Sequence, residues 1–264
     1  MKRILEEIIG YQQLVVNLKK KRMPVDILKS FPEFSNPTRS LKQAVSNPPE
    51  RHGRAGSEEG IIAEFKRRSP SKETINLKAD VMEIAQSYEQ MGAAGMSVLT
   101  NQRYFGGSLE DLQLAKSVCE LPILRKDFMV DAYQMYEAKA YGADAILLIA
   151  NALTAEKLEE LAILAKELGL EILFEIHEAD EIQKLETRYI DLIGVNNRNL
   201  RTFEVDIQQG LDMLPHLPSD LLKISESGIQ DRETIQKLIQ QGFNGVLVGE
   251  FFMKEKLKAQ NSNK

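Results

Sequence analysis

Short apolar runs alternate with longer amphipathic stretches along the chain from about residue 60. The runs, rich in β-branched residues, lie at 61–65, 96–100, 122–126, 144–149, 171–176, 190–196, 222–227 and 245–249. Each is continuously apolar, as is typical of strands in a parallel sheet that is buried on both faces. The stretch 154–169 is helical in pattern, with Thr154 as a candidate N-cap and Gly169 as a C-terminal stop.

Eight consecutive strand–helix units predict an α/β fold, a closed (β/α)8 TIM barrel, rather than an open doubly wound sheet. The GxGxxG fingerprint of such a sheet does not follow the first run. The chain has 264 residues, enough for one barrel of about 250 residues and a small extension. We therefore predict a single domain over residues 1–264, with the barrel at 60–264.

Residues 1–59 stand outside this pattern and form a predicted N-terminal helical extension. Its first helix has an apolar stripe made of Ile4, Ile8, Tyr11, Val15 and Leu18. A run at 46–60, rich in Pro, Gly and charge, reads as a loop leading into the first strand. The extension has too few apolar residues for a core of its own, so we expect it to pack over one end of the barrel.

The composition narrows the class of protein. Hydrophobic residues make up 43% and charged residues 28%, as in soluble globular proteins, and the net charge of −5 argues against a broad nucleic-acid surface. The chain lacks an apolar run of about 18 residues that could span a membrane. Cys119 is the only cysteine, which suits a reducing compartment, and the three histidines lack ligand spacing. We expect a cytoplasmic protein without a metal site.

Charged and polar side chains gather where the predicted strands end. Barrel enzymes carry their active sites at the C-terminal strand ends, and a charge there is costly to bury. A single such charge is more often part of a structural ion pair. A ring of lysines and glutamates, however, can move acid and base pKa values toward neutrality, which predicts an acid–base site. The ring consists of Glu64 and Lys66 on one inward face, Lys126, Glu175, Asn196 and Glu226.

The last two strand ends differ in character. Ser227 and Gly228 open the loop after the seventh strand, and Gly249 precedes a predicted final helix that starts at Glu250. Glycines allow close backbone approach, helix N-termini favour anions, and barrels frequently bind phosphate at this pair of loops. The alternative is that these glycines only turn the chain. Glu250 suits the helix dipole but would face a phosphate unfavourably unless it points away.

Several segments, in order, resemble the indole-3-glycerol phosphate synthase family of tryptophan biosynthesis. They are EFKRRSPSK, LTNQRYFGGSLEDL, LPILRKDFMVDAYQ, GADAILLIA, FEIHEADEI, IGVNNRNLRTFEVD and ISESGI. The resemblance covers most of the chain from about residue 60, and an N-terminal helical extension is also a family feature. It implies the substrate 1-(2-carboxyphenylamino)-1-deoxyribulose 5-phosphate, the products indole-3-glycerol phosphate, CO2 and water, and no cofactor.

The resemblance also implies roles for individual residues. Lys126 matches the general acid of the family, and Glu175 and Glu64 match its acid–base carboxylates. Lys66 matches the lysine that meets the substrate carboxylate, and Asn196 and Glu226 occupy polar family positions.

Further matches concern substrate binding. Residues matched to substrate contacts, including the apolar wall around the aromatic ring, are Ser69, Phe105, Phe128, Leu147 and Leu200, and we add Arg198 at the sixth strand end. Ser227, Gly228 and Gly249 match the phosphate contacts of the family, and we add Glu250 at the start of the predicted final helix. Phe251 departs from the family, which has a small residue there, and it is bulky for a position near phosphate.

Two alternatives remain open from the sequence. A phosphoribosylanthranilate isomerase-like barrel would want a Cys or Asp pair at the strand ends and no N-terminal extension. A non-catalytic barrel that binds a phosphate ligand should have lost some of the charges at the mouth, and none of the expected ones is missing. We expect a monomer that binds a small phosphorylated substrate, with no nucleic acid or membrane partner.

Overall fold

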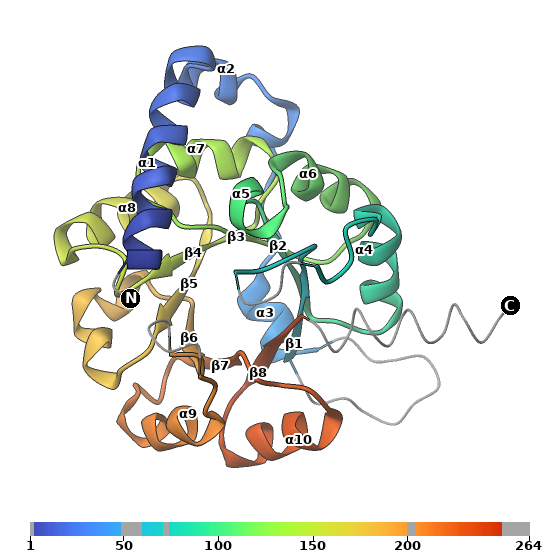
Figure 1. Cartoon of the computed structure of the whole chain (residues 1–264), viewed down its shortest axis with the longest axis vertical. Helices are drawn as coiled ribbons and strands as arrows, with labels where there is room; N and C mark the ends of the chain where they lie inside the picture. Colours follow the sequence, from blue (N-terminus) through green and yellow to red (C-terminus); the bar gives the residue numbers. More distant parts are fainter. Residues whose placement is uncertain (1–2, 49–59, 71–73, 200–203, 250–264) are drawn as a thin grey trace, which may run out of the picture.

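Eight parallel strands close into a barrel in the computed structural model, which describes residues 3–48, 60–70, 74–199 and 204–249 (Figure 1). The strands are β1 (Gly60–Phe65), β2 (Gly95–Leu99), β3 (Ile123–Lys126), β4 (Ala145–Ile149), β5 (Glu171–Ile176), β6 (Leu192–Asn196), β7 (Leu222–Glu226) and β8 (Gly245–Val248). Each pairs with its neighbours in sequence, and β1 pairs with β8 to close the ring. The predicted barrel is confirmed.

Helices surround the strands (Figure 1). They are α4 (Val81–Gln90), α5 (Gln102–Phe105), α6 (Leu109–Val118), α7 (Tyr133–Ala140), α8 (Ala155–Glu167), α9 (Ile207–Met213) with η4 (Leu214–His216), and α10 (Arg232–Gln241). Thr154 caps α8 by accepting from the backbone amide of Lys157 at 3.3 Å, and Gly169 ends that turn with φ 74°. Both predicted helix signals are confirmed.

The unit after β5 differs from the expected strand–helix pattern. Two 3-10 segments, η2 (Ala179–Lys184) and η3 (Thr187–Tyr189), replace an α-helix. The apolar side chains buried there, Leu185 and Ile190, lie five positions apart and cannot share one face of an α-helix. The predicted loop at 46–60 lies mainly, and the predicted final helix after Gly249 wholly, outside the described residues.

Strand alternation divides the core into two layers. Along β1, Ile61, Ala63 and Phe65 pack outward against the helices, whereas Ile62 points into the barrel with side chains from the other strands. Glu64 follows Ile62 on the inward face, as expected. The barrel interior is filled with buried aliphatic side chains below the charged groups.

The N-terminal segment reaches both ends of the barrel. It contains α1 (Arg3–Arg22), α2 (Val25–Lys29), η1 (Pro32–Ser35) and α3 (Leu41–Ser46). Helix α3 closes the N-terminal end, where Leu41 and Val45 join the interior core. Gly60 leaves room for this plug, since a Cβ there would lie 2.7 Å from Val45 Cγ1. The expectation that the extension packs over one end is therefore incomplete.

Helix α1 runs beside α7 near the opposite end (Figure 1). The predicted apolar stripe is wrong in its second half, because Leu18 is 57% exposed and Val15 is only half-buried. The buried positions are Ile8, Gln12 and Val16. A polar residue lies on the buried side because the barrel presents polar groups to it.

Candidate active site

A cavity of about 920 Å³ opens at the C-terminal ends of the strands. It is lined by most of the candidate residues, namely Glu64, Lys66, Ser69, Phe105, Lys126, Phe128, Leu147, Glu175, Asn196, Arg198, Ser227, Gly228 and Gly249. Glu226 is fully buried beside it. The candidates Leu200 and Glu250, together with Phe251, lie outside the described residues. The structure thus brings the described candidates together around one cavity.

Charged side chains from three strands form a connected cluster beside the cavity. Lys126 Nζ lies 2.6 Å from Glu226 Oε2 and 3.5 Å from Glu64 Oε2. Lys66 Nζ lies 2.6 Å from the other oxygen of Glu64, Oε1. Next to this cluster, Asn196 Nδ2 donates to Glu175 Oε1 at 3.0 Å. The inward strand positions therefore bring three carboxyl groups and two ammonium groups together.

Two glycines make room for these ion pairs. A Cβ at Gly194 on β6 would collide with Glu226 Oε1. A Cβ at Gly249 would lie 2.9 Å from Glu64 Oε1 and 3.2 Å from Lys66 Nζ. Gly194 was missed from the sequence, although a glycine within an apolar strand is a recognised sign of close approach.

The pKa of Glu64 and that of Lys126 move in opposite directions. Burial alone would raise the pKa of Glu64, but Lys66 and Lys126 outweigh it and lower the pKa to about 2. Burial would lower the pKa of Lys126, but Glu226, Glu64 and Glu175 together raise it above its ordinary value. At neutral pH, Glu64 is therefore a carboxylate and Lys126 an ammonium.

The other two carboxyl groups hold protons more tightly. Burial raises the pKa of Glu175, against the opposing effects of Lys126 and Asn196. Burial raises the pKa of Glu226 to about 7; Lys126 opposes this shift and Glu175 adds to it. With all groups ionised, three carboxylates would share two ammonium ions, and the surplus negative charge favours retention of one proton. Groups of this kind can exchange a proton near neutrality.

The raised pKa of Glu226 predicts a pH-dependent effect of Glu226→Gln on stability. The folded-state pKa of about 7 exceeds the ordinary value of 4.5, so the folded state binds the proton more tightly. The stability that comes from tighter proton binding by Glu226 in the folded state is fully present below pH 4.5 and is lost as pH rises through 7. The glutamine variant lacks this loss, so its stability relative to wild type should increase between pH 5 and pH 8 in urea unfolding. An equal difference at both pH values would contradict the assignment.

An apolar wall faces the charged cluster. The rings of Phe105 and Phe128 lie 6.4 Å apart between centroids, at an interplanar angle of 30°. Leu147 is buried beside the cavity. Side chains from outside the predicted strand ends complete the lining, namely Ile4, Leu5 and Ile8 of α1 together with Val205 and Ile207. Sequence reasoning missed their role because it treated α1 only as a packing element.

Another part of the cavity is lined by two basic side chains and by residues with an unusual backbone conformation. Ser227 and Gly228 both have positive φ, 70° and 82°. The serine conformation is uncommon for a residue with a side chain, and Asn197 Nδ2 holds it by donating to the Ser227 carbonyl at 3.1 Å. Arg198 lines the cavity together with Lys237 of α10. Lys237 was missed, since one lysine on a helix carries no sequence signal.

His177, at the end of β5, is another residue that sequence reasoning did not select. It is buried, and its Nε2 lies 3.7 Å from Glu175 Oε1. Neither ring nitrogen has a hydrogen-bond partner among the described residues. Burial lowers the pKa of this imidazole, so it is neutral at physiological pH.

The described residues include neither a metal-binding cluster nor a membrane-spanning helix. They hold no group of three or more His, Cys, Asp or Glu side chains arranged to bind a metal ion. Among the same residues, no helix combines the length and apolar character needed to cross a membrane.

Solved structures similar to this chain show the fold. A chain of the tryptophan synthase complex of Pyrococcus furiosus matches with a TM-score of 0.56 and 15% identity, over 73% of this chain and 88% of that one. An N-acetylmannosamine-6-phosphate 2-epimerase from Clostridium perfringens matches with a TM-score of 0.57 and 15% identity, over 81% of this chain and 99% of that one.

Relatives that match by sequence have a much higher identity to this chain than these structures do. An indole-3-glycerol phosphate synthase of Bacteroides thetaiotaomicron is 47% identical over 96% of this chain and 94% of its own length. One from Burkholderia lata is 42% identical over 96% of this chain and 95% of its own length. The family model described as indole-3-glycerol phosphate synthase matches residues 5–263. With a match over nearly its whole length, this chain belongs to the indole-3-glycerol phosphate synthase family.

Proposed function

We propose that the chain converts 1-(2-carboxyphenylamino)-1-deoxyribulose 5-phosphate to indole-3-glycerol phosphate, CO2 and water, with Lys126 as the general acid. Family membership supports this reaction over an isomerase-like or non-catalytic barrel. The observation that carries the residue assignment is the ammonium group of Lys126, held 2.6 Å from Glu226 beside the cavity. No feature of the cavity favours a second function.

Ring closure needs a carbonyl group polarised enough for an aryl carbon to attack it. Lys126 stays protonated because of the surrounding carboxylates, so it can donate to the carbonyl oxygen as negative charge develops there. The ring carbon that attacks also carries the carboxylate, and CO2 leaves it once the new carbon–carbon bond has removed the aromaticity of the ring. The resulting hydroxyl then departs as water while the ring system gives up a proton.

The three glutamates have different roles in this scheme. Glu175 and Glu226 have raised pKa values and can take up or release the protons of the later steps. Glu64, with its pKa near 2, remains ionised and positions both lysines. Asn196 orients the carboxyl group of Glu175.

The remaining lining residues suit the rest of the substrate. Lys66 is assigned to the substrate carboxylate, and the Phe105–Phe128 wall to its aromatic ring. The phosphate is assigned to the loops at Ser227, Gly228 and Gly249, with Ser69, Arg198 and Lys237 beside them. Holding both anionic ends would favour a bent, near-attack conformer, an effect that can supply several kcal/mol.

The proposal extends to organisation and location. Residues 1–264 form one domain, supported by core contacts that α3 shares with the barrel interior. The protein works as a monomer, because the groups assigned above to the acid, the substrate carboxylate and the aromatic ring are all supplied by one chain. Its single cysteine and its biosynthetic family support a cytoplasmic location.

The direct test is a fluorescence assay with the purified protein and the carboxyphenylamino-deoxyribulose phosphate. The chain contains no tryptophan, so indole emission from the product has little protein background. Growth of indole fluorescence at a rate proportional to enzyme is expected. Absence of that signal would refute the proposed function.

Glu64→Gln should lower kcat more than it raises KM. The amide keeps the shape of the side chain but removes the charge that holds Lys66 and Lys126. We expect kcat to fall by roughly one to two orders of magnitude, less than the ~10²–10⁴-fold of a direct proton donor. Glu160→Gln, in a surface pair with Lys157, is the matched control and should leave both constants unchanged. A defect in KM alone would mean that Glu64 only directs Lys66.

A further inference from the structure

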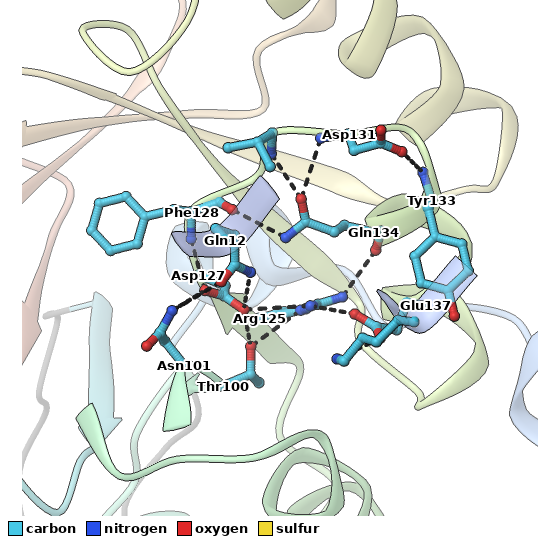
Figure 2. Close-up of polar contacts among 12 residues, drawn as sticks. Gln12, Thr100, Asn101, Arg125, Asp127, Phe128, Asp131, Tyr133, Gln134 and Glu137 are labelled. Carbon is cyan, nitrogen blue, oxygen red and sulfur yellow. Dashed lines mark hydrogen bonds and ion pairs between the residues drawn. The ribbon is translucent and has the colours of Figure 1, made fainter. Parts of the chain in front are cut away.

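A buried amide links the N-terminal helix to two strand ends at the cavity (Figure 2). Gln12 of α1 is 5% exposed. Its Nε2 donates to Asp127 Oδ2 at 3.2 Å, just beyond β3. Its Oε1 accepts from Asn101 Nδ2 at 3.0 Å, just beyond β2. One side chain thus uses both ends of its amide to bridge neighbouring strand ends.

The partner on the β2 side positions one aromatic wall. Asn101 caps α5, because its Oδ1 accepts from the Tyr104 backbone amide at 3.1 Å. Helix α5 ends at Phe105, which lines the cavity. Rotation of the Asn101 amide would release both the cap and its bond to Gln12. The placement of Phe105 therefore depends on an amide that Gln12 holds.

The partner on the β3 side positions the other wall. Asp127 lies between Lys126 and Phe128 in the chain, and its Oδ1 accepts from the Phe128 backbone amide at 2.9 Å. Its Oδ2 accepts from Thr100 Oγ1 at 2.8 Å. On the barrel side, Arg125 Nη2 lies 3.4 Å from the same oxygen. Asn101 Nδ2 also reaches Asp127 Oδ1, at 3.5 Å, and Gln12 is the donor to this carboxylate that comes from α1.

We propose that Gln12 is a positioning residue for the reaction, holding the Phe105 and Phe128 walls in register with Lys126. The inference rests on the proposed function, since it assigns those walls to the substrate ring. Gln12 acts through Asn101 and Asp127, which line the cavity, and it does not line the cavity itself. The N-terminal helix therefore contributes to turnover through one amide, besides the side chains of Ile4, Leu5 and Ile8 that line the cavity.

The chemistry of the bridge selects an amide at this position. The carboxylate of Asp127 needs a donor and the amide of Asn101 needs an acceptor, and glutamine supplies one of each. A glutamate would place a second carboxylate against Asp127. A leucine of similar size would leave two buried polar groups each short of one partner.

Gln12→Leu tests the proposal. A displacement of about 1 Å in a positioning residue can cost up to ~100-fold, so we expect kcat to fall roughly tenfold or more, and KM to rise less. The emission maximum of enzyme-bound indole-3-glycerol phosphate should shift to longer wavelength, because looser aromatic walls admit water. A purely structural role for Gln12 would not change that emission maximum at a temperature where the protein is folded.

Two control variants lie on the same helix. Gln13→Leu makes the same substitution at the adjacent, partly exposed glutamine and should change neither kcat nor emission. Val16→Ala weakens the packing of α1 at a buried position away from the cavity. It should lower the melting temperature while retaining the kcat and the emission maximum of wild type.

Several outcomes would overturn the proposal. One is an active wild type whose kcat and emission are unchanged in Gln12→Leu. Another is an equal fall of kcat in Val16→Ala, which would show that loss of helix packing is sufficient. Inactive wild-type protein would refute the proposed function and, with it, this inference, whereas the first two results leave the proposed function intact.

Discussion

Replacing Lys126 with alanine should lower turnover by about two to four orders of magnitude, the usual span for loss of a general acid. The variant loses the ammonium group that lies 2.6 Å from Glu226 and 3.5 Å from Glu64. Without it, no ammonium group is held at that point of the cavity. Steady-state measurement of indole fluorescence gives kcat, and circular dichroism shows whether the fold is retained.

Lys223→Ala is the matched control for this variant. Lys223 is also a largely buried strand lysine, but its Nζ donates to the Leu221 carbonyl at 3.0 Å and it does not line the cavity. Turnover should remain close to wild type in this control. Near-normal turnover in folded Lys126→Ala, or equal losses in both variants, would refute the general-acid assignment.

Arg125→Met should destabilise the fold by about 3–5 kcal/mol at pH 7, the usual cost of breaking a buried ion pair from one side. Arg125 of β3 is 1% exposed, and its side chain points toward Gln134 and Glu137 of α7 (Figure 2). It donates to Glu137 Oε2 at 2.7 Å and to the Gln134 carbonyl at 3.0 Å. Methionine would leave the carboxylates of Glu137 and Asp127 buried without this cation.

The pH dependence of this destabilisation provides a second readout. Burial would raise the pKa of Glu137, but Arg125 and Lys19 lower it below its ordinary value of 4.5. The stability from this pair is present above pH 4.5 and is lost as pH falls through the lowered pKa. The difference between Arg125→Met and wild type in urea unfolding should therefore shrink on acidification.

Lys19→Met measures the contribution of the exposed partner of Glu137 to stability, for comparison with that of the buried partner, Arg125. Lys19 also lies 2.6 Å from Glu137, but its side chain is 39% exposed. Its removal should cost about 1 kcal/mol or less. Similar losses in the two variants, or a loss in Arg125→Met that does not change with pH, would contradict the buried-pair account.

Much of the fold and of the site could be predicted from short patterns. Continuous apolar runs locate the eight strands to within a few residues, because a parallel barrel buries both faces of each strand. Strand alternation then places Glu64 and Lys66 inward, and the barrel architecture brings together strand ends that are distant in sequence. Lys126 and Glu226 are 100 positions apart and form an ion pair for this reason.

Other features depended on tertiary contacts that patterns do not encode. The stripe on α1 was misjudged because an apolar criterion passes over Gln12, whose burial depends on polar partners at the ends of β2 and β3. Lys237 enters the cavity only through the placement of α10. The two 3-10 segments after β5 form because Leu185 and Ile190 must both reach the core, and one α-helix could not bury both side chains.

The plug formed by α3 has a consequence for proton traffic. Leu41 and Val45 close the N-terminal end of the barrel, and buried aliphatic side chains fill the barrel between them and the charged cluster. In the described part of the chain, the cluster therefore meets solvent only through the mouth that admits the substrate. The substrate of the proposed function enters by the same mouth, so its binding would narrow this route. While substrate is bound, the lysines and glutamates would then transfer only the protons that they already hold. They would exchange protons with solvent again after the product leaves.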